Sequence, residues 1–235
     1  FVADSFTYGH GVRQTEDRFS NRLARSLDPE RYTVTNLSNL GIDLDWIQRL
    51  LVELFHDDYP VDTLVYVVCL NDIETCHPRF QTYYQDLGKH APSFFLFRDT
   101  YFFNLVYFRT RQFTVPDIKD YYSFVREYYD GRPWQLMQGR LDTLDELCRA
   151  HGAELQLVIF PFLHNLGPDY PFRHVHGQFA EYAETRKIKV LDLAPALEPH
   201  VAEGLTVNRF DAHPNERAHR LAAEAIRAEW FENGK

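Results

Sequence analysis

The chain of 235 residues is long enough for one large domain or two small ones with a sizeable core. Hydrophobic residues make up 45% and charged residues 25%, as is ordinary for a globular protein. The formal net charge of −9, without a lysine or arginine cluster, argues against a nucleic-acid partner, because phosphate binding requires a basic face. A neutral or cationic substrate suits this charge better.

The sequence predicts no disulfide framework and no integral membrane segment. Its cysteines are Cys69, Cys76 and Cys148. Three cysteines do not make a framework in a chain of this length, although a bond between the first two stays open. The most apolar stretch, 93–108, is interrupted by Arg98 and Asp99 and is too short to span a membrane. No signal peptide begins the sequence, yet Phe1 resembles the middle of a strand, so the localisation stays open.

The first residues predict a buried strand that ends in a polar turn. Apolar residues at 1–3 run into Asp4 and Ser5 and then into a glycine-containing turn. A strand of this kind delivers a hydroxyl group to the edge of a sheet, so Ser5 is a candidate nucleophile. The alternative is that Ser5 caps a helix or forms a turn.

Helical and strand patterns alternate along most of the chain. Apolar residues at helical spacing predict helices over 15–27, 43–54, 135–151, 172–186 and 214–231. Strands are expected over 32–37, 63–69, 155–160 and 189–193. The continuous β-branched run at 63–69 is typical of a strand covered on both faces of a parallel sheet. Strands separated by helices predict an α/β layered fold with a mainly parallel sheet.

Residues 77–134 interrupt this alternation and hold half of the aromatic residues. Because the alternation resumes afterwards, we expect a single domain over 1–235 with an insertion at about 77–133. The insertion is either a wall or lid over Ser5 that binds an acyl chain, a sugar ring or an aromatic group, or a satellite core or subunit interface. An oligomer formed through it stays open.

Four polar motifs follow the predicted strands or precede the last helix, where reactive groups of such a sheet gather. In chain order they are Ala3-Asp4-Ser5-Phe6, Asn39-Leu40-Gly41, Leu70-Asn71-Asp72 and Asp211-Ala212-His213-Pro214-Asn215. Together they resemble the four motif blocks of the SGNH (GDSL-like) hydrolase family, in the family's order and across almost the whole chain. The resemblance implies a three-layer α/β/α sandwich with a flavodoxin-like sheet of about five strands.

The same resemblance implies a serine esterase. Ser5 is then the nucleophile, His213 the general base, and Asp211 the acid that fixes the imidazole tautomer. The implied oxyanion donors are the backbone N–H groups of Ser5 and Gly41 and the side-chain amide of Asn71. No metal or other cofactor is implied, and the substrate is a small-molecule, carbohydrate or lipid ester. An acyltransferase on the same scaffold and a catalytically silent binding module are the alternatives.

Two positions depart from the family pattern. Ala3 stands where a glycine usually precedes the Asp-Ser pair, and we expect this small residue to be tolerated. Asp211 lies only two residues before His213, closer than in the commoner Asp-x-x-His spacing. A turn can still bring the pair together; otherwise a Ser-His dyad remains, oriented by a backbone carbonyl.

Other polar residues are weaker candidates for a site. His10 borders the pocket or lies in an exposed loop. A metal interpretation of His164, His174 and His176 lacks a carboxylate or cysteine partner, so no metal site is predicted there. Cys69 is expected to be a small buried hydrophobic residue.

Overall fold

The computed structural model describes residues 1–78, 91–111, 113 and 121–232. The chain forms two compact units, one of Phe1–Asp72 with Gln138–Lys235 and the other of Ile73–Met137. Each unit is described by itself, and a single domain with an insertion at about 77–133 stays a prediction.

The first unit holds the alternating helices and strands. Its α-helices are α1 (Ser5–Tyr8), α2 (Phe19–Ser26), α3 (Leu44–His56), most of α9 (Arg132–Ala150), α10 (Arg173–Arg186), α11 (Ala194–Leu197) and α12 (Glu216–Arg227). Its strands are β1 (Thr63–Cys69), β2 (Glu154–Phe160), β3 (Lys189–Asp192), β4 (Thr206–Asn208) and β5 (Asp211–Pro214). Shorter helical turns are η1 (Thr15–Asp17), the start of η2 (Leu70–Cys76), η3 (Leu163–Asn165), η4 (Glu198–Glu203) and the π-helical η5 (Ala228–Glu232).

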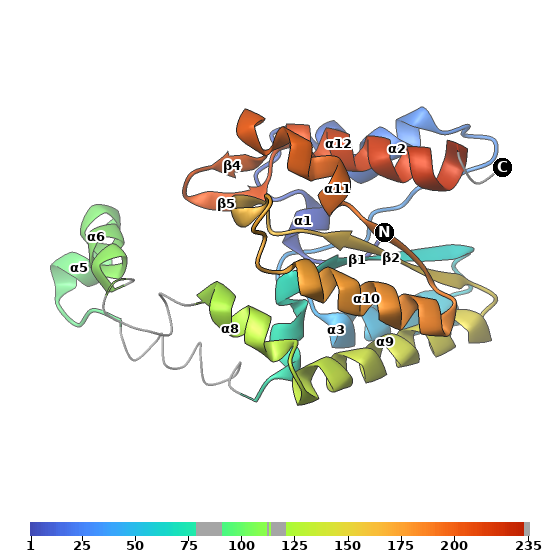
Figure 1. The fold of residues 1–235 in the computed structure, drawn as a ribbon, viewed down its shortest axis with the longest axis horizontal. Coiled ribbons are helices and arrows are strands. Elements are labelled where there is room, and N and C mark those ends of the chain that lie inside the picture. Colours follow the sequence, from blue (N-terminus) through green and yellow to red (C-terminus); the bar gives the residue numbers. More distant parts are fainter. Residues whose placement is uncertain (79–90, 112, 114–120, 233–235) are drawn as a thin grey trace. The chain divides into compact units, whose positions relative to one another are not determined.

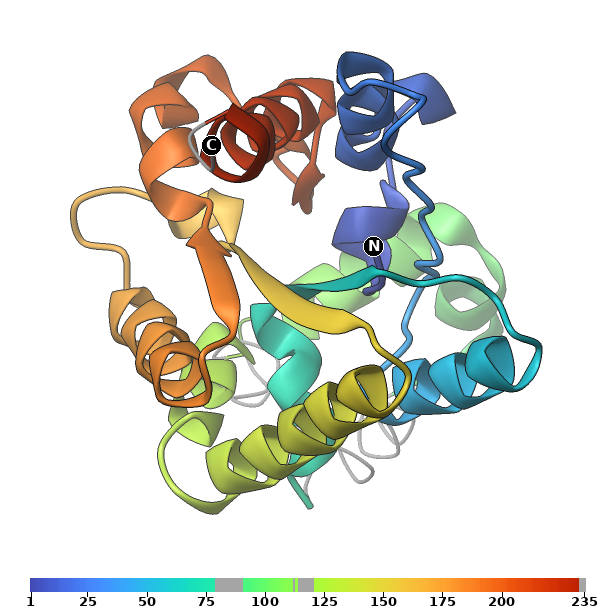
Figure 2. The same ribbon diagram turned by 90° about the vertical axis from the view of Figure 1, so that its right-hand side faces the viewer.

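The core of this unit is a parallel sheet with the order β1-β2-β3. The register places Tyr66 beside Leu157, and Leu157 beside Val190. Six of the seven residues of β1 and of β2 are buried, which explains their continuous apolar sequences. Helices α2, α11 and α12 cover one face of the sheet, and α3, α9 and α10 cover the other (Figures 1 and 2). The predicted α/β/α layering is confirmed.

The expected count of about five strands is wrong, because the described residues form a parallel sheet of three. Two further segments lie beside the sheet and form backbone hydrogen bonds there, but they are too irregular to count as strands. Val2 forms a single parallel bridge with Tyr66, and residues 35–39 exchange backbone hydrogen bonds with residues 1–3.

The four residues Asp211–Pro214 form a strand rather than the loop that the sequence suggested. They pair in antiparallel fashion with β4, with Thr206 beside Pro214 and Asn208 beside Asp211. Helix α12 therefore begins at Glu216, after an Asn215 cap, and not at Pro214. Side chains two residues apart on a strand point to the same face, so the short Asp211–His213 spacing places both side chains together.

Gly11 lets the chain after α1 approach this hairpin closely. Its φ is +85°, and a Cβ built on it would lie 2.5 Å from the Cγ2 atom of Val207 on β4. Gly11→Ala should therefore lower the free energy of unfolding by about 1 to 3 kcal/mol, because both the left-handed backbone and the contact are unfavourable for alanine. Denaturant unfolding measures this loss.

Gly139 provides the matched control. It lies within α9, has no positive φ, and has open space where a Cβ would stand. Gly139→Ala should raise the free energy of unfolding by about 0.5 to 1 kcal/mol, since alanine is the better helix former. Equal effects of the two substitutions would contradict the assigned role of Gly11.

His219 is a buried, neutral histidine between α12 and α2. It is fully buried, and its Nδ1 atom accepts a 3.2 Å hydrogen bond from the backbone N–H of Phe19. Burial, and to a smaller extent the positive charges of Arg18 and Arg22, lowers the pKa of His219 from 6.5 to about 4. The unfolded chain therefore binds the proton more readily, so stability falls as the pH drops through this interval.

Between neutral pH and pH 4, protonation of His219 in the unfolded chain should lower the free energy of unfolding by about 3 kcal/mol. Urea unfolding at several pH values measures it. His219→Gln keeps an acceptor for the Phe19 N–H but does not titrate, so its stability should depend less on pH by that amount. The same acid sensitivity in both proteins would contradict the assignment.

Candidate active site

Ser5 stands at the junction between the first extended segment and α1. Asp4 caps this helix by accepting a 3.1 Å hydrogen bond from the backbone N–H of Phe6. The cap holds the turn and leaves Ser5 as the first helical residue. Ser5 itself is partly exposed, so the strand-to-helix turn presents its hydroxyl group outside the core.

Ser5, His213 and Asp211 form a continuous hydrogen-bonded chain. The Nε2 atom of His213 lies 3.0 Å from the Oγ atom of Ser5, and its Nδ1 atom lies 2.6 Å from Oδ1 of Asp211. In the tautomer with its proton on Nδ1, the ring donates to Asp211 and accepts the Ser5 proton at Nε2. The structure thus brings together all three residues predicted to be catalytic, although 208 positions separate Ser5 from His213.

The Asp211 carboxylate is held in its charged form. Burial acts to raise its pKa, but hydrogen bonds from the ring and the backbone N–H of His213 outweigh it and lower the pKa. The backbone bond to Oδ1 measures 3.1 Å. An anion fixed beside Nδ1 selects the ring tautomer in which Nε2 is free to act as a base.

Asn215 fixes the end of the strand that carries the histidine. Its side-chain oxygen accepts two hydrogen bonds from the first turn of α12, and its amide nitrogen donates to the carbonyls of Gly204 and Thr206 at 3.1 and 3.0 Å. One side chain therefore ties β5 to both α12 and the β4 region.

Two aromatic rings border His213. The Phe6 ring lies edge-on at 5.5 Å between centroids, and the exposed His10 ring lies at 4.5 Å. His10 thus satisfies both interpretations of the sequence, since it is an exposed loop residue and borders the site. Potential ligand atoms of His10, Asp211 and His213 lie within 4.8 Å of one another, so among the described residues this group could hold a metal ion.

The predicted oxyanion donors follow neighbouring segments of the sheet. Gly41 is exposed and has a φ of +66°, and it follows Asn39, whose N–H bonds to the carbonyl of Ala3. Asn71 lies in η2 directly after β1, and its buried side-chain oxygen has no hydrogen-bond partner. Their roles as donors stay predictions.

The two described histidines of α10, His174 and His176, do not share a site. His176 is buried on α10, with Nδ1 2.8 Å from Oδ1 of Asp192, whereas His174 is exposed on the same helix. Two positions apart on a helix do not face the same side, which separates their rings. Cys69 is buried at the end of β1, as expected of a small hydrophobic residue.

A scan against protein-family models and a search of curated proteins find no match for this chain. Solved structures do resemble it. TesA superposes with a TM-score of 0.56 at 17% identity, over 96% of this chain and 93% of that one. A member of the lipolytic protein G-D-S-L family from Veillonella parvula gives 0.56 at 17% identity, over 98% and 96%. The psychrotrophic esterase EstA from Pseudoalteromonas sp. gives 0.54 at 16% identity, over 96% and 94%.

These likenesses extend over nearly the full length of each compared protein. They show that the chain has the SGNH (GDSL-like) hydrolase fold, which the four sequence motifs predict. In the part of the chain that the structure describes, no helix is both long and apolar enough to cross a bilayer.

Proposed function

We propose that this chain, with its SGNH hydrolase fold, is a serine ester hydrolase that acts through an acyl-Ser5 intermediate. The observation that supports the proposal is the hydrogen-bonded series from Ser5 through His213 to Asp211. A free serine hydroxyl is a poor nucleophile near neutral pH, and this series supplies the base that it needs. The similarity of fold to esterases and lipases supports the same chemistry.

We assign each proton transfer of the proposed reaction to a named atom. His213 Nε2 takes the Ser5 proton as Oγ bonds to the ester carbonyl carbon, and the carbonyl electron pair moves to its oxygen. The imidazolium, stabilised by Asp211, then protonates the departing alcohol as the tetrahedral intermediate collapses to acyl-Ser5. A water molecule loses its proton to Nε2 and attacks the acyl carbon, and this proton returns to Ser5 as the carboxylic acid leaves.

The oxyanion of each tetrahedral intermediate needs fixed hydrogen-bond donors. We assign them to the backbone N–H groups of Ser5 and Gly41 and to the Asn71 side chain. The parallel pairing of Val2 with Tyr66 supports the third assignment, because it aligns the carboxyl ends of the two segments that precede Ser5 and Asn71. The assignment of the Ser5 N–H rests on its place in the first turn of α1, where backbone N–H groups have no acceptor within the helix.

Asn71→Ala should lower kcat by about 100- to 1000-fold, because one donor to the oxyanion is lost. Steady-state hydrolysis of an activated acetyl ester measures it. Asn71→Asp keeps the side-chain size but replaces the donor with negative charge, so its loss should be at least as large. Asn165→Ala, at an exposed position outside the site, is the control and should retain full activity. Normal kcat in both Asn71 variants would exclude this donor.

Product analysis distinguishes hydrolysis from acyl transfer. The protein is incubated with an activated acetyl ester, with and without sugar or glycerol acceptors, and free acid and transfer product are followed over time. We expect free acid to be the main product under both conditions. Transfer product in excess of free acid would instead identify an acyltransferase, and no turnover at all would favour a binding module.

The alcohol and acyl parts of the substrate are proposed only as classes. Carbohydrate and lipid esters both fit an enzyme of this kind with an aromatic-rich segment, since aromatic faces bind sugars and acyl chains alike. A panel of esters with acyl chains of increasing length, on sugar and glycerol alcohols, would rank these classes by kcat/KM.

A further inference from the structure

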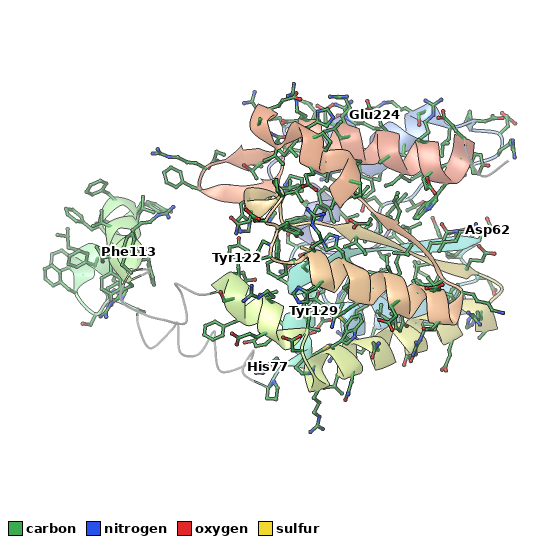
Figure 3. The ribbon with its side chains drawn as sticks, in the orientation of Figure 1. Asp62, His77, Phe113, Tyr122, Tyr129 and Glu224 are labelled. Carbon is green, nitrogen blue, oxygen red and sulfur yellow. The ribbon has the colours of Figure 1, made fainter. Side chains whose placement is uncertain are left out.

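The second unit contains a helical hairpin that exposes an unusual number of apolar rings. It consists of α5 (Phe95–Asp99) and α6 (Tyr101–Arg111), and a third helix of this unit is α8 (Tyr121–Tyr128). No residue of α5 or α6 is buried. The exposed apolar side chains at the hairpin are Phe94, Phe95, Tyr101, Phe102, Phe103, Leu105, Val106 and Phe113. Figure 3 shows aromatic rings around the two helices, with Phe113 labelled.

The hairpin satisfies its own polar groups at the point where the helices meet. The Thr100 hydroxyl donates a 2.6 Å hydrogen bond to the carbonyl of Leu96, and the Asn104 amide donates a 2.9 Å bond to the carbonyl of Phe97. Phe97 also packs against Phe103, with ring centroids 6.0 Å apart. These contacts hold the two helices together, so that an apolar medium would meet few unsatisfied polar groups at the connection.

The apolar residues surround α6 instead of forming one stripe. Tyr101, Phe102 and Phe103 are consecutive, and their exposed fractions are 98%, 67% and 37%. Three consecutive residues of a helix point in different directions around its axis. A flat protein surface would cover only one of these sides, whereas a medium that encloses the helix covers several.

Charge distinguishes this hairpin from the rest of the chain. Arg98 and Asp99 neutralise each other through a bidentate ion pair at 2.7 and 2.8 Å. Arg109 and Arg111 add positive charge at the end of α6, in a chain whose net charge is −9. Anionic phosphates complement them.

The length of α6 fits an interfacial position. Its 11 residues extend about 16 Å, roughly half of the hydrocarbon core of a bilayer. Aromatic rings beside arginine are typical of segments that lie at the boundary between lipid headgroups and acyl chains.

We propose that the α5–α6 hairpin binds anionic lipid surfaces, with its exposed rings at the headgroup boundary and Arg109 and Arg111 at lipid phosphates. The binding requires only this hairpin and does not depend on the chemistry of Ser5. It gives the chain a means of concentrating at a lipid surface.

Vesicle co-sedimentation of the full chain tests the proposal. Phosphatidylcholine vesicles with and without phosphatidylglycerol are compared, and the wild-type protein should bind the anionic vesicles more tightly. Tyr101→Ser/Phe102→Ser should weaken this binding at least about tenfold. Phe210→Ser removes a ring that is 65% exposed in the first unit, and this matched control should bind like the wild type. Arg109→Gln/Arg111→Gln should lose the preference for anionic vesicles.

Circular dichroism verifies that each variant is folded, and Phe102→Trp gives a second readout, since its fluorescence should shift to shorter wavelength on binding. The proposal is overturned if wild-type protein binds neither vesicle, or if the Tyr101/Phe102 variant binds as tightly as Phe210→Ser. It is also overturned if sedimentation velocity shows a wild-type dimer that this variant abolishes while vesicle binding is unchanged, because a second copy then covers the rings.

Discussion

Ser5→Ala should lower kcat for an activated ester by about a million-fold, and His213→Ala by a similar factor. In the proposed mechanism the Ser5 hydroxyl forms the acyl bond and the His213 ring, 3.0 Å away, removes its proton, so neither residue can act without the other. Steady-state and single-turnover kinetics measure the loss. Thermal unfolding should be nearly unchanged, because both side chains are partly exposed.

The double variant provides a sharper test. Residues that act as one unit are strongly non-additive, so Ser5→Ala/His213→Ala should be no slower than either single variant. Ser26→Ala, in α2, and His200→Ala, which removes another histidine bonded to a carboxylate at 2.8 Å, are the matched controls. A His213→Ala enzyme of normal activity would refute the assignment of the base.

Asp211→Asn should lower kcat by about ten-thousand-fold. Asparagine can keep the backbone hydrogen bond from His213, but its amide removes the anion that selects the Nδ1–H tautomer and stabilises the imidazolium. The comparison of kcat for the variant and the wild type on one activated ester measures this loss. Glu203→Gln makes the same change at the His200 pair and should have no effect on turnover.

The size of this loss distinguishes a triad from a dyad. A decrease of only a few fold would mean that Asp211 serves the β4–β5 hairpin and that Ser5 and His213 act alone. The 2.6 Å bond between Asp211 and His213 supports the triad, which the two-residue spacing left open at the level of sequence.

The layered fold was predictable because burial leaves a local pattern. The β-branched run at 63–69 coincides with β1, and the amphipathic stretch at 43–54 nearly coincides with α3. Both elements are long enough for their periodicity to be read without knowledge of their neighbours. The strand count was overestimated because sequence cannot show whether an extended segment, such as 32–37, forms a ladder or only isolated backbone hydrogen bonds.

The convergence of Ser5, His213 and Asp211 was predictable from their motifs, but the contacts that support these residues were not. Strand β5 has only four residues and ends in Pro214, so no alternation revealed it, and its partner β4 has only three. The contacts of Phe6 and His10 with His213 depend on the same hairpin and join residues about 200 positions apart. Such contacts follow from tertiary packing, which a single sequence does not specify.

Covalent labelling with a serine-directed fluorophosphonate tests the proposed nucleophile most directly. The folded protein is treated with the reagent, digested, and analysed by mass spectrometry, with Ser5→Ala and His213→Ala treated in parallel. We expect one adduct on Ser5 in the wild type and, on the same timescale, no adduct in either variant. An unlabelled Ser5 in the folded wild-type protein would contradict both its role as a nucleophile and the proposed ester hydrolysis.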